Sequence, residues 1–433
     1  MQNNKSNFLY PWYVVFVLML AYTVAFIDRQ ILSLLIEPIK LDLNISDTQI
    51  GLLAGLAFGI FYSIVGIPIA QLADRKNRVG IISIGVALWS FMTALCGLAN
   101  TYFNLFLARI GVGVGEAALS PAAYSMITDY FPKDKLGRAI GVYVIGLYLG
   151  AGIAMIVGSA VISYVSTLPE IILPLYGLIK PWQLAFILVS LPGILILILL
   201  ITVKEPQRGF YDSKSITNEE IPFKKVVQYL WGLRKIFTNL IIGVCINGAV
   251  IVGYMVWIPE WLRRNLDVSI VDAGIIYGSV LLIFGSIGPF TGGWISDYLL
   301  KKGYRDAPMR TVYFAAILTV PLAVIMPLSS NLTSAIVLLS LVTFFFSIPQ
   351  ALPPVVLQTI SPNKMRAQTI AIFMFFSNIL SYAFGATIIA LITDLFGYEG
   401  ALKYSMAITS GLMIPIGCYF IYKTLYPLRN LEY

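Results

Sequence analysis

The sequence predicts an all-α membrane protein with twelve transmembrane helices. Of its 433 residues, 58% are hydrophobic and only 12% are charged, and the mean hydropathy is +0.85. Soluble domains carry roughly 25% charged residues, so water is not the main solvent of this chain. Apolar runs such as VVFVLMLAYTVAF (14–26) are continuous, whereas the strands of an outer-membrane barrel alternate. A helical span needs about 20 apolar residues, so a chain of this length has room for twelve.

Charged and turn residues divide the chain into twelve apolar segments. The predicted spans are 12–36, 48–73, 79–98, 102–127, 138–165, 182–203, 237–260, 271–299, 309–328, 333–357, 364–393 and 400–422. If the amino terminus is cytoplasmic, 22 of the 29 Lys and Arg residues lie in cytoplasmic loops and tails, five lie on the other side and two lie within spans. This asymmetry predicts that both termini are cytoplasmic. The net charge of +8 then belongs to loops facing anionic lipid, and nucleic acid is not an expected partner.

The longest polar stretch separates six spans from six. It begins with KEPQRGFYDSKSITNEE and continues into the basic amphipathic segment PFKKVVQYLWGLRK. We therefore expect an amino-terminal bundle at 1–203, a cytoplasmic linker with an amphipathic helix at 204–236, and a carboxyl-terminal bundle at 237–433.

An internal repeat supports the same division. GIPIAQLADRKNR, which contains Asp74, follows the second span, and GPFTGGWISDYLLKKGYR, which contains Asp297, follows the eighth. Arg138 after the fourth span and Arg366 after the tenth have nearly the same separation, close to half the length of the chain. Two features at nearly the same offset predict two parallel six-helix pseudo-repeats.

Composition argues against an enzyme. The chain has no histidine, and its three cysteines stand in apolar stretches without the spacing of a metal site or a disulfide framework. Neither a phosphate-binding loop nor a soluble domain is evident, so we expect no cofactor, no metal and no primary pump. A transporter-like sensor would need a signalling module, and the longest polar stretch is only 204–237.

Several motifs resemble those of one transporter superfamily. The stretch from Gly66 to Arg78 and the run Arg109-Ile-Gly-Val-Gly-Val-Gly are similar to signatures of the major facilitator superfamily. The segments 113–143, 27–43 and KEPQRG (204–209) resemble the bacterial branch of the Spinster family of lipid transporters. The resemblance implies the fold of that superfamily, a secondary transporter with alternating access, and a bacterial inner (plasma) membrane location.

Four ionisable residues stand inside predicted spans, where a charge costs roughly 2.5–3.5 kcal/mol on insertion scales. They are Asp28 and Arg29 in the first span and Arg109 and Glu116 in the fourth. With the regular rise of an α-helix, Asp28 and Arg109 lie at comparable depth, so a pair between them is geometrically possible. Glu116 is expected to face the central cavity, where desolvation disfavours its ionised form and a nearby Arg29 favours it.

Without histidine, carboxyl groups are the natural proton carriers. We therefore assign proton coupling to Asp28 and Glu116. The Spinster resemblance implies that Arg29 and Arg109 are the substrate and charge partners. The alternative is a buried ion-pair network that only fixes helix packing.

A cytoplasmic gate is predicted after the second span. Asp74 can pair with Arg75 and Arg78 and approach the start of a neighbouring helix, and Gly66 and Asp297 complete the set. The alternative is a solvated loop that only anchors orientation.

The carboxyl-terminal half is expected to supply an uncharged cavity wall. The candidates are Asn247, Tyr254, Trp257, Gln350, Asn378 and Tyr382. Each could instead only hydrogen-bond a neighbouring helix. One charged wall and one uncharged wall suit a small amphipathic molecule. The Spinster resemblance implies that this molecule is a lysophospholipid or a sphingoid-type compound, transported with protons. The alternative is a proton-coupled permease for a small organic or aromatic acid that Arg29 and Arg109 clamp. Membrane lipid is the surrounding partner, and we expect a monomer because one chain contains both halves.

Overall fold

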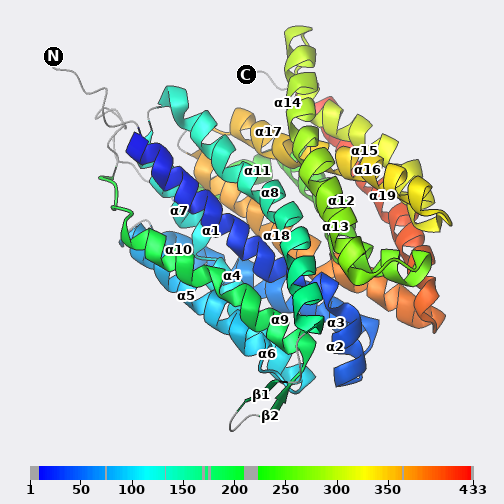
Figure 1. The fold of residues 1–433 in the computed structure, drawn as a ribbon. Helices are drawn as coiled ribbons and strands as arrows, with labels where there is room; N and C mark the ends of the chain where they lie inside the picture. The colour runs from blue at the N-terminus through cyan, green and yellow to red at the C-terminus, as the bar shows by residue number, and fades with distance from the viewer. Residues whose placement is uncertain are drawn as a thin grey trace. The chain divides into compact units, whose positions relative to one another are not determined.

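The chain is almost entirely helical. The computed structural model describes residues 9–73, 76–131, 133–167, 171–173, 177–208, 223–362 and 365–430. Within these residues, twelve helices are long and apolar enough to cross a membrane, which confirms the predicted fold class. Two short strands form an antiparallel hairpin between α8 and α9 (Figure 1).

The elements follow in this order: α1 (Leu9–Leu34), α2 (Ile36–Leu43), α3 (Asp47–Gly51), the π-helix η1 (Leu52–Leu56), α4 (Ala57–Ala73), α5 (Arg78–Cys96), α6 (Tyr102–Glu116), α7 (Leu119–Tyr130), α8 (Lys133–Ser166), β1 (Ile171–Leu173), β2 (Gly177–Ile179), α9 (Pro181–Ser190), α10 (Pro192–Ile201), α11 (Phe223–Gly232), α12 (Arg234–Leu266), α13 (Ile270–Val280), the π-helix η2 (Leu281–Gly285), α14 (Ser286–Lys301), α15 (Ala307–Ile325), the 3₁₀ turn η3 (Met326–Leu328), α16 (Leu332–Ser347), the 3₁₀ turn η4 (Ile348–Ala351), α17 (Leu352–Ile360), α18 (Arg366–Phe396), the 3₁₀ turn η6 (Glu399–Ala401) and α19 (Leu402–Arg429).

The chain forms two compact units. Unit 1 comprises Met1–Ile45, Ala57–Ile216 and Ser269–Leu282, and unit 2 comprises Ser46–Leu56, Thr217–Val268 and Ile283–Tyr433. Each unit therefore contains a short segment that the chain order would assign to the other. The predicted amphipathic linker helix corresponds to α11, which buries Val226 and Leu230. The rest of that linker, residues 209–222, lies outside the described residues.

Local backbone features repeat with the same residue separation as the loop acids Asp74 and Asp297. Asn44 and Asp267, which end α2 and α12 in the left-handed conformation with φ of 51° and 53°, have the same separation in the chain as Asp74 and Asp297. Ser46 and Ser269, whose side chains cap the starts of α3 and α13, have that separation too. Asn and Asp tolerate the left-handed conformation, and a serine oxygen satisfies a free amide at a helix start. The two halves of the sequence thus use the same local chemistry at equivalent turns.

Small residues bring the helices of unit 1 into close contact. α1 packs along α8, and a methyl group placed on Gly150 would lie 3.0 Å from Cα of Thr23. A methyl group on Gly115 of α6 would lie 2.6 Å from the backbone nitrogen of Trp89 in α5. Without a hydrophobic driving force in lipid, such close backbone approach supplies much of the packing.

Candidate functional site

The four charged residues of the spans gather in unit 1. α1 positions Asp28 and Arg29, and α6 positions Arg109 and Glu116. Asp28, Arg109 and Glu116 are at most 2% exposed, whereas the side chain of Arg29 retains 12% exposure. The cluster contains two basic and two acidic groups, and contacts between opposite charges lower the cost of holding them in a low-dielectric interior.

Arg29 and Glu116 form the direct ion pair of this cluster. Nη2 of Arg29 donates to Oε2 of Glu116, so the first and fourth spans are linked through their charges. Arg109 lies at the level of Asp28, as expected from span geometry, but its Nη1 donates to the backbone carbonyl of Asp28 at 3.2 Å. The side-chain pair of Asp28 with Arg109, which span depth made possible, is not the contact observed, because depth along a helix does not determine where around the helix a side chain points.

Asp28 has few partners for a buried acid. Within the described part of the chain, neither of its carboxylate oxygens makes a hydrogen bond of normal geometry. Its electrostatic neighbours include Glu116, Arg109 and Thr93.

Aromatic rings surround the guanidinium of Arg29. Its Cζ lies 4.3 Å from the ring centroid of Phe58, 4.6 Å from that of Phe26 and 5.6 Å from that of Tyr62. Cation–π contacts of this kind are worth up to about 2 kcal/mol when the cation is desolvated. They stabilise the guanidinium of Arg29 inside the span.

A group of tyrosines, which sequence reasoning missed, extends from this cluster. Tyr22 stacks on Tyr143 with centroids 5.0 Å apart, and Tyr124 meets the same ring edge-on at 5.3 Å. The hydroxyl of Tyr143 lies 3.2 Å from that of Ser120. Tyr22 has Arg29 among its electrostatic neighbours. Single tyrosines in spans carry no sequence signal for such a group, because its members come from α1, α7 and α8.

The predicted gate is described only in part. Asp74 and Arg75 lie outside the described residues. Gly66 is half-buried in α4, with no heavy atom within 4 Å of a methyl group placed on it, and Asp297 is exposed on α14.

Arg78, the remaining gate residue, is buried in unit 1 between two acids that sequence reasoning missed. Its Nη1 lies 2.5 Å from Oδ2 of Asp129, and its Nε lies 2.7 Å from Oε1 of Glu205. Glu205 also accepts from the backbone amides of Arg78 and Val79 at 2.9 and 3.1 Å, at the start of α5. Both acids stand in segments that carry the Spinster resemblance: Glu205 in KEPQRG (204–209) and Asp129 in 113–143.

Two aromatic cavity candidates of unit 2 make interhelical hydrogen bonds. Tyr254 donates to the carbonyl of Ala323 at 2.5 Å and lies 2.8 Å from Oγ of Ser410, and Nε1 of Trp257 donates to the carbonyl of Ala386 at 2.9 Å. Both side chains are buried. These contacts are those of the alternative interpretation, in which the residue joins neighbouring helices.

The other candidates of unit 2 are less enclosed. Asn247, Asn378 and Tyr382 are half-buried, and Gln350 is exposed. Asn247 lies against Gly417 of α19, so that a methyl group on this glycine would collide with its amide.

The sequence model of the Major Facilitator Superfamily matches residues 18–386 of this chain. The chain belongs to the Major Facilitator Superfamily. The hexuronate transporter of Bacillus subtilis (strain 168) is 25% identical over 414 residues, 93% of each chain. Protein spinster of Drosophila melanogaster is 26% identical over 320 residues, 72% of this chain and 50% of that protein. Among solved structures, a bacterial homologue of the human lysosomal transporter Spinster, described as inward-facing and unoccupied, matches with a TM-score of 0.84 and 26% identity over 100% of both chains.

These likenesses confirm the predicted superfamily and the resemblance to Spinster proteins. Membership makes the chain a multi-pass membrane protein and a secondary transporter, since this superfamily and its fold belong to transporters and not to enzymes.

Proposed function

We propose that this facilitator-superfamily transporter moves an amphipathic, lipid-like molecule, of the lysophospholipid or sphingoid type, by alternating access and with protons. The observation that carries the proposal is the buried pair of Arg29 with Glu116, beside Asp28 and Arg109. Four ionisable groups are costly within spans, and in membrane proteins such residues usually serve substrate or proton pathways.

Proton coupling follows from competition for Arg29. When Glu116 accepts a proton on its carboxylate, it becomes neutral and its pair with Arg29 loses its Coulombic part. The guanidinium can then bind an anionic group of the substrate, while the rings of Phe26 and Phe58 keep it in place. Release of substrate and proton restores the ion pair. Asp28 is the second carboxyl group of this exchange.

The lipid-like substrate is supported by the likeness to the bacterial Spinster homologue. In this assignment Arg29 and Arg109 bind the charged head, and the apolar tail lies against the uncharged spans of the carboxyl-terminal half. Of the six side chains predicted there, Asn247, Gln350, Asn378 and Tyr382 remain the proposed lining for the tail, since Tyr254 and Trp257 join neighbouring helices.

A second candidate is a proton-coupled permease for a small organic acid, such as a sugar acid. It is favoured by the likeness to the hexuronate transporter and by the group of Tyr22, Tyr124 and Tyr143, whose rings and hydroxyls suit the faces and hydroxyls of a sugar. Arg29 would then bind the substrate carboxylate.

Uptake into proteoliposomes separates the two candidates. We expect an imposed proton gradient to drive accumulation of a radiolabelled lysophospholipid and not of a radiolabelled hexuronate; the reverse would favour the permease. We expect Glu116→Gln to abolish gradient-driven accumulation but to preserve exchange without a gradient. Asp267→Asn is the matched control, since it removes an exposed carboxylate at a left-handed position that Asn adopts equally well. Unchanged pH dependence in Glu116→Gln would leave the cluster with only a packing role.

We also propose that the chain lies in a bacterial inner membrane as a monomer, with both termini cytoplasmic. The lysine and arginine asymmetry of the loops supports this orientation. In it, Gly66, Asp74, Arg75, Arg78 and Asp297 are on the cytoplasmic side, where the gate is proposed.

A further inference from the structure

A groove lies between the ninth and twelfth spans, on unit 2. It has a volume of about 610 Å³ and is formed by α15 and α19. Small-molecule sites in proteins typically have volumes of about 300–1,000 Å³, so the groove is large enough for a ligand. The side chains that line this α15–α19 groove are apolar, aromatic, proline or cysteine side chains, and they include Tyr313, Ile317 and Pro321 of α15 and Pro415, Tyr419 and Tyr422 of α19. Its occupant is therefore apolar along most of its length.

The groove opens at the surface of the spans. Both helices belong to segments that are long and apolar enough to cross a membrane, Ala307–Leu328 and Glu399–Arg429. Ile317 is 39% exposed and Tyr422 is 58% exposed. Within a bilayer, lipid chains cover such apolar surface, because they are as apolar as leucine. The occupant of the groove is thus a lipid chain or a helix of another protein molecule.

The corresponding spans of the first half pack closely. The third span is α5 and the sixth is α9 with α10, and a methyl group on Gly193 of α10 would collide with the side chain of Ser90 in α5. Between α19 and α15, a methyl group on Gly411 would lie 3.4 Å from Cγ2 of Val324, which is ordinary contact. Each of these two helices also contains a proline in its interior, which interrupts helical hydrogen bonding and bends a helix. The internal repeat therefore does not by itself produce the groove.

Lys423 is a cation beside the groove. Its Nζ lies 4.3 Å from the ring centroid of Tyr419, one of the lining side chains, and the residue is exposed. Among the described residues, this ammonium forms no ion pair with a carboxylate. The long stem of a lysine can follow apolar surface and bring its charge to the level of the lipid headgroups. A lipid phosphate is an anion that this position can bind within a membrane.

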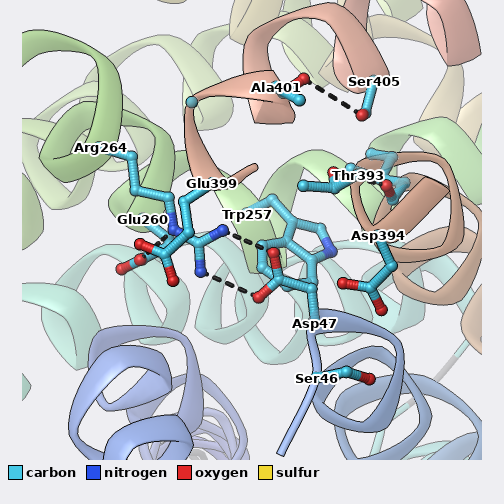
Figure 2. Close-up of polar contacts among 12 residues, drawn as sticks. Ser46, Asp47, Trp257, Glu260, Arg264, Thr393, Asp394, Glu399, Ala401 and Ser405 are labelled. Carbon is cyan, nitrogen blue, oxygen red and sulfur yellow. Dashed lines mark hydrogen bonds and ion pairs between the residues drawn. The ribbon is translucent and has the colours of Figure 1, made fainter. Parts of the chain in front are cut away.

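Several arginines of unit 2 pair with acids of the same unit. Nη1 and Nη2 of Arg264 hold the two carboxylate oxygens of Asp47 at 2.5 and 2.9 Å (Figure 2). Where α15 begins and α19 ends, Asp306 pairs with both Arg310 and Arg429, at 3.2 and 2.7 Å. One carboxylate for two arginines leaves this second cluster with a net positive charge, which favours an anion nearby.

The groove and the basic residues have the relative depths of an acyl chain and its headgroup. Tyr422 and Pro415 stand 7 and 14 residues before Arg429, so with the regular helical rise the groove extends from ~10 Å to ~21 Å beyond that arginine. Half of a bilayer with its headgroups is about 20–22 Å thick. At this end, residues 301–310 and 423–429 contain six basic residues and one acid. By the proposed orientation this end is cytoplasmic, where the membrane surface carries anionic lipid.

We propose that the α15–α19 groove binds one anionic phospholipid, with an acyl chain in the groove and the phosphate at Lys423. The net positive cluster around Asp306 attracts the same headgroup. This lipid is distinct from the proposed substrate, because the groove is on unit 2 and the pair of Arg29 with Glu116 is in unit 1. The inference goes beyond the proposed function, and only the choice of leaflet depends on the proposed orientation.

Native mass spectrometry of the full chain in detergent measures this binding directly. We expect phosphatidylglycerol, the anionic probe, to bind about fivefold more tightly than phosphatidylcholine with the same acyl chains, because an anionic headgroup gains the attraction of a nearby lysine. Inorganic phosphate at the same concentration should not displace the lipid, since the acyl chain supplies much of the affinity. Equal affinity for the two lipids, or displacement by phosphate, would overturn the proposal.

Two variants separate the contribution of the headgroup from that of the chain. Lys423→Gln should remove the preference for phosphatidylglycerol. Ile317→Trp, which fills the groove, should weaken the binding of both lipids about tenfold, as expected when about two methylene groups of the chain lose their contact. Binding like that of the parent protein in either variant would contradict the assigned site.

Each variant has a matched control on the same helix. Lys403→Gln removes a lysine at the other end of α19, where Nζ lies 5.1 Å from the ring centroid of Tyr404. Ile325→Trp adds the same bulk to α15 at a residue that is 54% exposed and outside the groove lining. Both controls should bind the two lipids as the parent protein does, and a loss as large as in Lys423→Gln or Ile317→Trp would show that the groove is not the site.

Photo-crosslinking in vesicles locates the chain. Phosphatidylglycerol with a diazirine on one acyl chain, in vesicles of phosphatidylcholine, should attach mainly to peptides that contain residues 313–321 and 415–422. Phosphatidylcholine with the same diazirine should label these peptides about fivefold less, in proportion to its affinity. Equal labelling by the two lipids, or labelling spread evenly over the spans, would refute the site. A dimer that Ile317→Trp abolishes would assign the groove to a second copy of the chain and would refute it as well.

Discussion

Glu205→Gln tests how the segment after the sixth span is anchored to unit 1. The carboxylate of Glu205 accepts three hydrogen bonds at the start of α5, from Nε of Arg78 and from the backbone amides of Arg78 and Val79. A glutamine of the same shape has one carbonyl oxygen and one NH₂ group. Glutamine can therefore accept hydrogen bonds through one oxygen only, and its NH₂ group would face a donor from which Glu205 now accepts.

The expected loss can be worked from these contacts. A hydrogen bond to a charged group contributes about 1.5–3 kcal/mol, and a negative charge at a helix start adds about 0.3–1 kcal/mol. The side chain of Glu205 is 25% exposed, so water offsets part of this loss. Asp129 still neutralises Arg78. We therefore expect unit 1 to lose about 2–3 kcal/mol of unfolding free energy.

The buried cysteines provide the assay. Cys96 lies in unit 1, and Cys245 and Cys418 lie in unit 2. In a variant that keeps only Cys96, Glu205→Gln should accelerate the reaction with a fluorogenic thiol reagent about 30- to 150-fold, since about 1.4 kcal/mol corresponds to a tenfold change. In a variant that keeps only Cys245, the rate should hardly change. An unchanged Cys96 rate, or equal acceleration at both cysteines, would refute the assigned anchoring role.

Three other outcomes are expected. Gly150→Val should prevent close packing of α1 on α8 and abolish the peak of folded protein in size-exclusion chromatography, whereas Gly66→Ala, with open space around it, should elute normally. Trp257→Phe loses the 2.9 Å bond to Ala386 and about 1 kcal/mol of stability, measured by thermal unfolding, but should leave the transport KM unchanged; a raised KM would assign Trp257 to the substrate site. Arg29→Lys keeps the charge but loses the planar group over the aromatic rings, so the KM should rise about tenfold; an unchanged KM would separate Arg29 from substrate binding.

The span pattern illustrates what sequence can predict. The expected first span, 12–36, corresponds to α1 at Leu9–Leu34, and the expected sixth span, 182–203, corresponds to the helices at Pro181–Ile201. Hydropathy and span length are local quantities, and the bilayer imposes them on each helix separately. The internal repeat could also be predicted from the sequence, because a duplicated sequence keeps its turn residues at one constant separation.

The sequence predicted which residues form the charged cluster but not which of their side chains pair. Asp28, Arg29, Arg109 and Glu116 are unusual in spans by composition alone, and their depth follows from the helical rise. The structure pairs Arg29 with Glu116 and directs Arg109 to a backbone carbonyl. Which side chains meet depends on helix rotation and packing, and neither is encoded in hydropathy.

Composition and spacing were enough to predict the membrane environment, the twelve helices, the internal repeat and the four charged residues within spans. Each of these is a local property of the chain. The partners of the buried charges emerged only from packing: Arg78 with Asp129 and Glu205, and Arg264 with Asp47, which are 217 residues apart in the chain. Such pairs depend on packing, because it removes both charges from water, and each charge is then stabilised mainly by its partner.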